Sequence, residues 1–492
     1  MNTFANVMRE MGTMTLTENG GKAFSTTGGG ALLDLFANIG GMRGRSDADI
    51  ISQWRSAYRE NPELASNLIL YARSIRTGGL GERKIGRILL KQLATYDPEK
   101  IIRNFDTIVD CGRWDDLFIF IGTPVEFTMW QYIENQVKAD VEGALRNKPI
   151  SLLAKWLKSE NTSSRESREI AKNTRIILHL TSKQYRKMLS KLRKYINVLE
   201  AKISRNQWDE INFEQVPSLA MKRYLSAFGK HCYEAFGEYK AKLVKGEAKV
   251  NAATLYPYDL VQPYIANNRY GRRDPMDVVT EEQWKALPNY VNENYDVVCV
   301  VDTSGSMTIN NYRPLSTAVG LGIYFAQHNK GPYHNLYMTF SSNPTIQRIE
   351  DNWGLDRCID YVMASDWGMG TDLDRTFQLI FDIARAYNDA PRAIAVISDM
   401  EINTWHGEGD VYARSITEKW DQKFRSIGLK CPKLLYWNIE SRHGNTLSKC
   451  TENVGYISGS SAGSFKFFTE LIEKSAYEAM VSILTKPEFS WK

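Results

Sequence analysis

Oxygen-bearing side chains follow two apolar, β-branched segments in the second half of this 492-residue chain. Residues 297–301 read VVCVV and lead into DTSGS at 302–306, and residues 393–398 read AIAVIS and lead into Asp399. Such runs are typical of strands buried on both faces of a parallel sheet, where ligands bind at the carboxyl ends of the strands. A carboxylate and two hydroxyls at alternate positions can offer three hard oxygens to one small cation.

A threonine in the GMGTD segment at 368–372 adds a fourth oxygen, and the second strand end adds a carboxylate. The candidate metal ligands are Asp302, Ser304, Ser306, Thr371 and Asp399. Their order and spacing resemble the von Willebrand factor A domain and its metal-ion-dependent adhesion site. That resemblance implies Mg²⁺, or another divalent cation, bound directly or through water. The alternative is a metal-free domain of the same fold in which these residues cap turns.

The composition describes an ordinary globular protein of two or three domains, with 43% hydrophobic and 24% charged residues. A net charge of +5 permits an anionic partner without requiring one. The six cysteines form no CxxC pair, which favours reduced thiols, no zinc ribbon and a cytoplasmic location. No stretch reaches the roughly 18 apolar residues of a membrane span, and no signal peptide is visible, so no membrane association is expected.

The domain order predicted from these patterns is a helical part followed by an α/β part. Residues 1–30 are rich in Gly, Thr and Ser and predict a flexible arm. Residues 31–290 show helix after helix with short breaks, which predicts an α-solenoid of divergent repeats or, alternatively, an irregular all-α domain. Residues 291–475 alternate strands and helices and predict a doubly wound, Rossmann-like sheet. Residues 476–492 predict a helix that packs back on the helical domain, and a tail.

Several phrases of the helical part are specific in combination, and they occur at Ser25–Arg45, Asn61–Lys84, Asp110–Leu117, Gln215–Phe228 and Val250–Val261. Followed by the metal-site domain, they resemble the Ro autoantigen, or TROVE-domain, family, and more closely its divergent relatives in plants and bacterial viruses. The resemblance covers nearly the whole chain. It implies HEAT-type repeats closed into a monomeric ring, with small structured RNAs on a basic outer face and single-stranded ends in the central hole. This chain is shorter than the typical Ro protein, so its repeat number or its closure can differ.

Basic residues gather between positions 165 and 205, against only three acids. The candidate RNA-binding residues there are Arg165, Arg168, Lys172, Arg175, Lys183, Arg186, Lys187, Lys191, Arg193 and Lys194. Tyr185 and Tyr195 are interleaved and could stack on bases. Such a stretch attracts phosphates through counterion release, and the alternative is a solvated helix face.

Two further features of the helical part have both a functional and a structural interpretation. Arg76, Arg83 and Lys84 surround the glycine-rich residues 78–81, which could cradle a phosphate or simply connect two helices. The acids of DCGRWDD at 110–116 could do acid/base chemistry but are better explained as caps of the following helix. Four prolines make residues 257–294 linker-like, with a short helix around Trp284.

The sequence shows no catalytic triad, phosphate-binding Walker loop or nuclease carboxylate cluster, so no enzyme activity is expected. The leading prediction is a non-catalytic RNA-binding protein of a ribonucleoprotein, acting on small or misfolded RNA. The alternatives are an adaptor whose metal site captures an acidic residue of a partner, such as a MoxR-type ATPase, and a virion or structural component.

Overall fold

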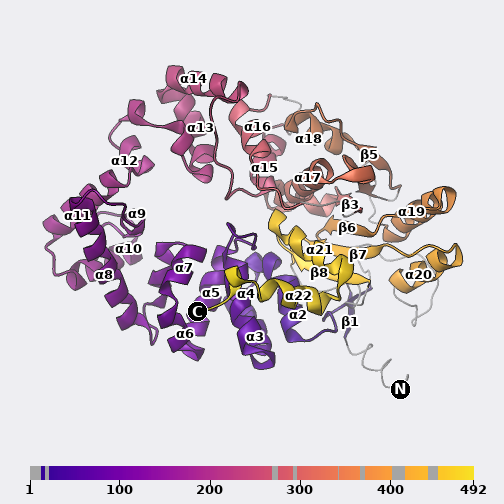
Figure 1. Cartoon of the computed structure of the whole chain (residues 1–492), viewed down its shortest axis with the longest axis horizontal. Helices are drawn as coiled ribbons and strands as arrows, with labels where there is room; N and C mark the ends of the chain where they lie inside the picture. The colour runs from indigo at the N-terminus through magenta and orange to yellow at the C-terminus, as the bar shows by residue number, and fades with distance from the viewer. Residues whose placement is uncertain are drawn as a thin grey trace. The chain divides into compact units, whose positions relative to one another are not determined.

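The chain folds as two compact units. The computed structural model describes residues 13–16, 22–268, 275–291, 296–341, 343–365, 372–401, 416–441 and 453–492. The first unit combines Met1–Ile85 with Ala252–Phe489, and the second combines Gly86–Asn251 with Ser490–Lys492. The predicted fold class is confirmed, because a helical region precedes a C-terminal α/β region (Figure 1). The boundaries between the two units, after Ile85 and before Ala252, differ from the domain boundaries expected from the sequence.

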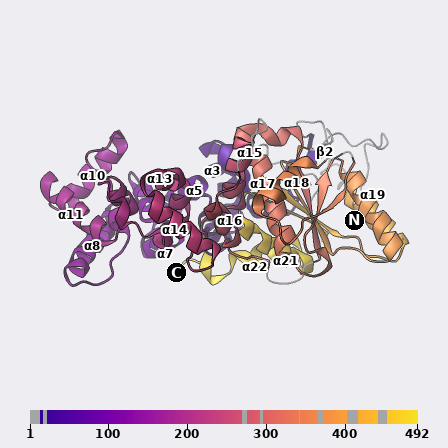
Figure 2. The same ribbon diagram turned by 90° about the horizontal axis from the view of Figure 1, so that it is seen from above.

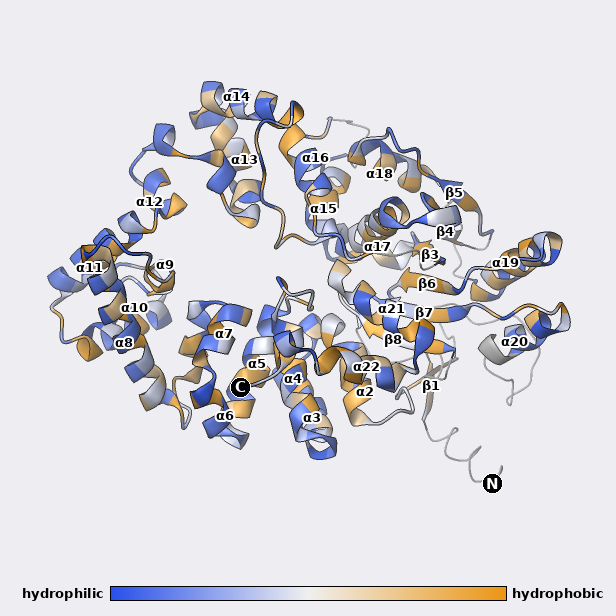
Figure 3. Ribbon diagram, viewed as in Figure 1, coloured by the Kyte–Doolittle hydropathy of each residue, from blue (hydrophilic) through white to orange (hydrophobic). Residues whose placement is uncertain are grey.

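The α/β region is built on one six-stranded sheet in the first unit. Its strands are β3 (Val297–Asp302), β4 (Leu336–Phe340), β5 (Ile346–Arg348), β6 (Ala393–Ser398), β7 (Lys433–Asn438) and β8 (Val454–Ser458), in the spatial order β5-β4-β3-β6-β7-β8. All neighbours are parallel except β4 and β5. Every residue of β3 and β6 is buried, and Figure 3 colours β6 as hydrophobic. The two apolar segments are therefore the central strands, as predicted.

Helices cover both faces of the sheet. On one face, α19 (Leu373–Tyr387) and α20 (Ile416–Ser426) pack on the even-numbered residues of β3, such as Val300, with Phe377 stacked on Trp420 at 5.7 Å. On the opposite face lie α17 (Ile309–His328) and α21 (Phe465–Glu473). A Cβ on Gly322 of α17 would lie 2.4 Å from a Val301 methyl, so this glycine permits close helix–strand packing. Figure 2 shows the sheet between α17 and α19.

In its described residues, 257–268 and 275–291, the proline-rich passage forms two helices rather than a plain linker. Pro257 occupies the first turn of α15 (Pro257–Asn267), where a missing N–H costs nothing, and α15 packs along α17. The helix expected around Trp284 is α16 (Val278–Lys285). Trp284 donates its indole N–H to the Gln327 side chain at 2.8 Å, and α18 (Leu355–Ala364) packs on the same long helix. Sequence composition alone suggested a linker because it does not distinguish a proline at a helix start, such as Pro257, from a proline in a loop.

The N-terminal segments belong to the same unit as the sheet. Part of the expected arm forms a hairpin of β1 (Met14–Leu16) and β2 (Lys22–Phe24). The helices α2 (Ala31–Asn38), α3 (Asp47–Glu60) and α4 (Pro62–Arg73) follow, with η1 (Ile39–Gly44) after α2. A Cβ on Gly40 would lie 2.0 Å from the Ser458 carbonyl oxygen at the end of β8. Because Gly40 has no side chain, its backbone can contact the backbone of Ser458 at the carboxyl edge of the sheet.

The C-terminal helix packs on the N-terminal helices of the same unit. In α22 (Ala476–Leu484), the Leu484 carbonyl accepts a hydrogen bond from the Asn67 side chain of α4 at 3.0 Å. The buried ring of Phe489, in η8 (Pro487–Phe489), stands edge-on to Tyr71 at 5.2 Å. Both contacts lie within the first unit, which contains α22 as well as the N-terminal helices.

The second unit is entirely helical in the part that the structure describes. Beyond most of α5 (Arg83–Tyr96), it contains α6 (Pro98–Arg103), α7 (Phe105–Cys111), η2 (Trp114–Phe120), α8 (Glu126–Leu145), α9 (Leu153–Trp156), α10 (Arg165–Ile177), α11 (Ser182–Tyr195), α12 (Leu199–Ile203), η3 (Trp208–Glu210), η4 (Phe213–Gln215), α13 (Ser218–His231) and α14 (Tyr233–Val244). HEAT-type repeats and a closed ring remain predictions. Within the described residues, none of these or the other helices has the length and apolar character that a bilayer crossing requires.

Candidate cation site and nucleic-acid interface

Two buried carboxylates meet at the carboxyl edge of the sheet. Asp302 is the last residue of β3, and Asp399 directly follows β6, its parallel neighbour. The register pairs Val301 with Ile397, so both strands end at the same level. Both aspartates are at most 1% exposed. The predicted convergence of these two residues is therefore observed.

The loop after β3 brings its hydroxyls next to the Asp302 carboxylate. The Ser304 N–H donates to Asp302 Oδ1 at 2.9 Å, and the Ser304 and Ser306 hydroxyl oxygens lie 3.1 Å apart. The short helix η5 (Gly305–Thr308) closes the loop, and its Thr308 hydroxyl donates to the Gly305 carbonyl at 2.8 Å. The two serine side chains are therefore neighbours and remain partly accessible.

The electrostatics of the Asp302 and Asp399 carboxylates favour the binding of a cation or a proton. Burial, and after it the negative charge of Asp399, raises the pKa of Asp302 to about 6, against the hydrogen bonds from Ser398 and Ser304. Two carboxylates held close together in a buried site repel each other unless a proton or a cation compensates. No basic side chain is among the groups that act on Asp302.

The donor set fits a small, hard cation. Two ligands at right angles about a Mg²⁺ ion, with bonds of about 2.0–2.1 Å, lie roughly 2.9 Å apart, which is close to the separation of the two serine hydroxyls. Carboxylate and hydroxyl oxygens suit Mg²⁺ better than zinc. Within the described residues no cluster of three or more His, Cys, Asp or Glu side chains forms a metal site, so any site here depends on the hydroxyls.

The fifth expected ligand lies outside the described residues. Thr371 falls in the gap between residues 365 and 372. The next residue, Asp372, caps α19, because its carboxylate accepts the Arg375 N–H at 3.1 Å. The position of Thr371 in the ligand set thus stays a prediction.

A strip of basic side chains covers the exposed face of α11 in the second unit. Its buried face is formed by Tyr185, Leu189 and Leu192, and the opposite face carries Lys183, Arg186, Lys187, Lys191 and Lys194, all exposed. The helix contains no acidic residue. None of the five forms an ion pair within the described part of the chain. We call these five residues the α11 basic face.

Several other residues of the basic stretch have structural partners. Arg193 is half-buried and donates to the carbonyls of Ala154 and Leu157 at 2.9 and 2.7 Å, and burial lowers its pKa. Arg175 pairs with Glu160 at 2.9 Å. These two arginines hold α10 and α11 to the segment before them, and their assignment to RNA binding stays a prediction.

The remaining members of the stretch lie on or near α10 and are exposed. Arg165 pairs with Glu169 at 3.0 Å, and Arg168 donates to the carbonyls of Thr162 and Ser163. Lys172 is exposed and has no ion pair among the described residues. Lys172 is therefore a better candidate for a phosphate contact beside the α11 basic face than Arg165 and Arg168, which have partners.

The aromatic residues of the stretch are engaged in the fold. Tyr185 is fully buried, and its hydroxyl donates to the Lys158 carbonyl at 2.8 Å. It is unable to stack on a base, so that expectation is wrong. Tyr195 is 40% exposed but donates to the Lys148 carbonyl at 2.9 Å. The alternation of tyrosines and lysines in the sequence did not show that Tyr185 lies on the buried face of α11.

The second basic set surrounds a packed connection in the first unit. The N–H groups of Leu80 and Gly81 donate to the carbonyls of Tyr71 and Ser74, so they are not available for a phosphate. The Gly79 carbonyl accepts the Ser461 hydroxyl at 2.8 Å. The structural alternative is thus the correct one for this loop.

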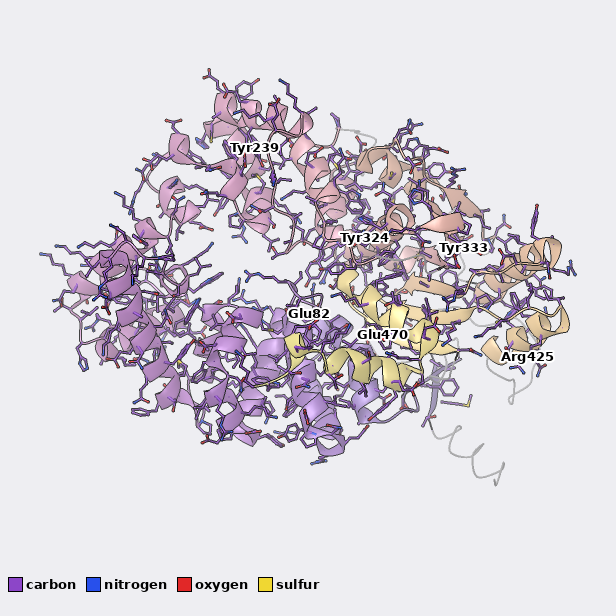
Figure 4. All side chains as sticks on the ribbon, in the orientation of Figure 1. Glu82, Tyr239, Tyr324, Tyr333, Arg425 and Glu470 are labelled. Carbon is purple, nitrogen blue, oxygen red and sulfur yellow. The ribbon has the colours of Figure 1, made fainter. Side chains whose placement is uncertain are left out.

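The charged residues of that set lie near a buried ion pair. Arg76 and Arg83 are exposed, and Lys84 donates to the Arg43 and Arg45 carbonyls. Glu82, labelled in Figure 4, pairs with Arg43 at 2.5 Å, and burial raises the pKa of Glu82 despite that partner. Lys84 is therefore structural in part, whereas Arg76 and Arg83 remain candidates.

The paired carboxylates of the DCGRWDD phrase are structural. Asp116 accepts the Arg113 N–H at 2.9 Å, which caps η2, and Arg87 pairs with Asp115 and Asp116 at 2.8 and 2.5 Å. Both acids are buried. The capping interpretation is confirmed.

Sequence reasoning missed one residue that contacts the candidate cation ligands, Ser398. Its hydroxyl donates to Asp302 Oδ2 at 2.5 Å from the neighbouring strand. The available signal was its position, since it ends the apolar run directly before Asp399.

Comparisons with known proteins identify relatives over nearly the whole chain. Two family models match, both described as domains of unknown function: DUF2828 over residues 149–295 and DUF7788 over residues 296–487. An uncharacterized protein, L728, of Acanthamoeba polyphaga mimivirus is 28% identical over 96% of this chain and 88% of its own length. The crystal structure of the Deinococcus radiodurans RO (RSR) protein matches with a TM-score of 0.50 at 15% identity, over 88% of this chain and 93% of that one. The fold is therefore Ro-like.

Proposed function

We propose that this chain is a non-catalytic RNA-binding protein that holds small or misfolded RNA through the α11 basic face. The supporting observation is a helix face with five exposed cations, no acid and no ion pair within the described part of the chain. Like charges at helical neighbour positions destabilise a helix, so such a face costs stability unless a polyanion compensates. Release of condensed counterions from RNA would supply the binding free energy.

The interface would read the phosphate backbone rather than bases. Lys187 and Lys194 are separated by seven residues, which is about 10 Å along a helix axis, so the lysines reach different phosphates. Residues 188–193, between these two lysines, include no aromatic side chain, and Tyr185 before them is buried. Binding should therefore depend little on sequence.

We also propose that Asp302, Ser304, Ser306 and Asp399, with Thr371, hold Mg²⁺. When bound, the ion would neutralise the two carboxylates and offer an open position to an oxygen ligand. The chain's own part is to keep the two carboxylates buried and the two hydroxyls adjacent. Too few carboxylates are present for two-metal hydrolysis, so the site is proposed to bind and not to cleave.

The experiment that tests the RNA proposal is recovery of RNA by ultraviolet crosslinking to the intact chain, followed by sequencing. Expected are crosslinks to peptides of residues 182–195 and co-purifying nucleic acid with a high 260/280 absorbance ratio. Recovery of no RNA above the background of an unrelated basic protein would refute the proposal. Partner capture that disappears with EDTA, in a protein free of RNA, would instead support the adaptor.

A further inference from the structure

One buried hydroxyl links the two strands that carry the candidate cation ligands. Ser398, the last residue of β6, is fully buried. Its hydroxyl donates to Asp302 Oδ2 at 2.5 Å and accepts the Met400 N–H at 3.0 Å. Because the Met400 N–H is always a donor, the hydroxyl hydrogen is directed to Asp302.

The backbone after Ser398 has the conformation that these two hydrogen bonds of the Ser398 hydroxyl require. Met400 has a left-handed backbone, with φ of 64°, which is costly for a residue with a side chain. Its side chain is buried in the core between the sheet and the helices α19 and α20. The turn directs the Met400 N–H back to Ser398, while the Glu401 N–H donates to Asp399 Oδ1 at 3.2 Å.

Hydrogen bonds from two different segments hold the two oxygens of the Asp302 carboxylate. Oδ1 accepts the N–H of Ser304 from its own loop, and Oδ2 accepts the hydroxyl of Ser398 from the neighbouring strand. Each oxygen keeps a lone pair for another partner. The plane of the carboxylate is therefore set by two strands before any ion arrives.

We propose that Ser398 is a positioning residue that makes this site selective for Mg²⁺ over Ca²⁺, an inference that rests on the cation site proposed above. Mg²⁺ requires near-octahedral geometry with short bonds, whereas Ca²⁺ accepts longer bonds and irregular ligand sets. A carboxylate held in one orientation by two hydrogen bonds can satisfy the octahedral geometry that Mg²⁺ requires. A carboxylate that is free to rotate can still coordinate Ca²⁺.

The test is a calorimetric titration of the full chain with Mg²⁺ and, separately, with Ca²⁺. Ser398→Ala should weaken Mg²⁺ binding about 10- to 100-fold, the usual effect of losing a hydrogen-bond partner of a metal ligand. Ca²⁺ binding should change less than about threefold, and Ser398→Thr should restore Mg²⁺ binding because it keeps the hydroxyl. The matched control is Ser316→Ala in α17, a buried serine whose hydroxyl has no hydrogen-bond partner in the described structure.

The outcomes separate this inference from the cation site itself. Unchanged Mg²⁺ binding in Ser398→Ala, or equal loss of Mg²⁺ and Ca²⁺, would overturn the positioning role and leave the site intact. Binding of neither ion by the wild-type chain would overturn both proposals. If Ser398→Ala does not fold, Ser398→Cys replaces it, since a thiol fills the space but is a weak donor. The cysteine variant should show an intermediate loss for Mg²⁺ alone.

Discussion

Removing three charges from the α11 basic face should weaken RNA binding by a calculable amount. The change is Lys187→Gln, Lys191→Gln and Lys194→Gln together, which leaves the buried face of α11 untouched. If each lysine neutralises one phosphate, the log–log slope of affinity against salt should fall by about 0.7–0.9 per residue. At 0.15 M salt this corresponds to about four- to sixfold per contact, or about 50- to 170-fold for three.

The assay is fluorescence polarisation with a labelled structured RNA at four salt concentrations between 0.05 and 0.3 M, roughly the range over which counterion release dominates. The matched control is Arg103→Gln, Lys138→Gln and Arg146→Gln, three exposed cations of the same unit that are each paired with a helical acid. Both triple variants lower the net charge from +5 to +2, since 5 − 3 = 2. A general charge effect would therefore be equal in the two.

Equal losses in both variants would refute the reasoning, because they would assign RNA binding to net charge instead of to one helix face. An unchanged slope in the α11 variant would show that this face is merely solvated. Circular dichroism in the absence of RNA should give the same helix content for both variants and the wild type.

Four further results are expected. Asp302→Ala should abolish the Mg²⁺-induced rise in melting temperature while the helical unit stays folded, and equal shifts in mutant and wild type would contradict the cation site. RNA affinity should survive both EDTA and Asp399→Ala, because lysines need no cation, and a loss in either test would mean that the ion contacts RNA or shapes its binding surface. Arg193→Ala should lower the free energy of unfolding in urea by about 2 kcal/mol, as two carbonyls lose a charged donor. Gly40→Ala should cost about 3 kcal/mol by overpacking against backbone, whereas Gly44→Ala, with no atom within 4 Å of its new Cβ, should be neutral.

The convergence of the two candidate carboxylate ligands, Asp302 and Asp399, could be predicted from the sequence. Parallel strands with buried, β-branched runs end at one edge of their sheet, so the residues after 301 and 398 had to lie together once both runs were identified as strands. The pairing of Val301 with Ile397 confirms that reasoning. The boundaries of β6 also agree, since the run AIAVIS is bounded by polar residues at both ends.

The role of individual basic residues was not accessible in the same way. Helical periodicity shows which side chains share a face of one helix, but it does not show what lies against that face. Arg193 and Lys194 are neighbours in the sequence, yet only Arg193 meets the carbonyls of Ala154 and Leu157. Those carbonyls come from a segment about forty residues earlier, which no local pattern connects to α11.

The sequence by itself determined the two central strands, the order of the helical and α/β parts and the edge of the sheet where the carboxylates gather, because these follow from local periodicity and strand direction. Only the tertiary structure decided that Ser398 holds Asp302, that Tyr185 is buried, and that Gly40 meets the end of β8. Each of these depends on contacts between segments far apart in the chain. Such contacts are set by packing of whole elements, and the residue types at either end do not specify their partner.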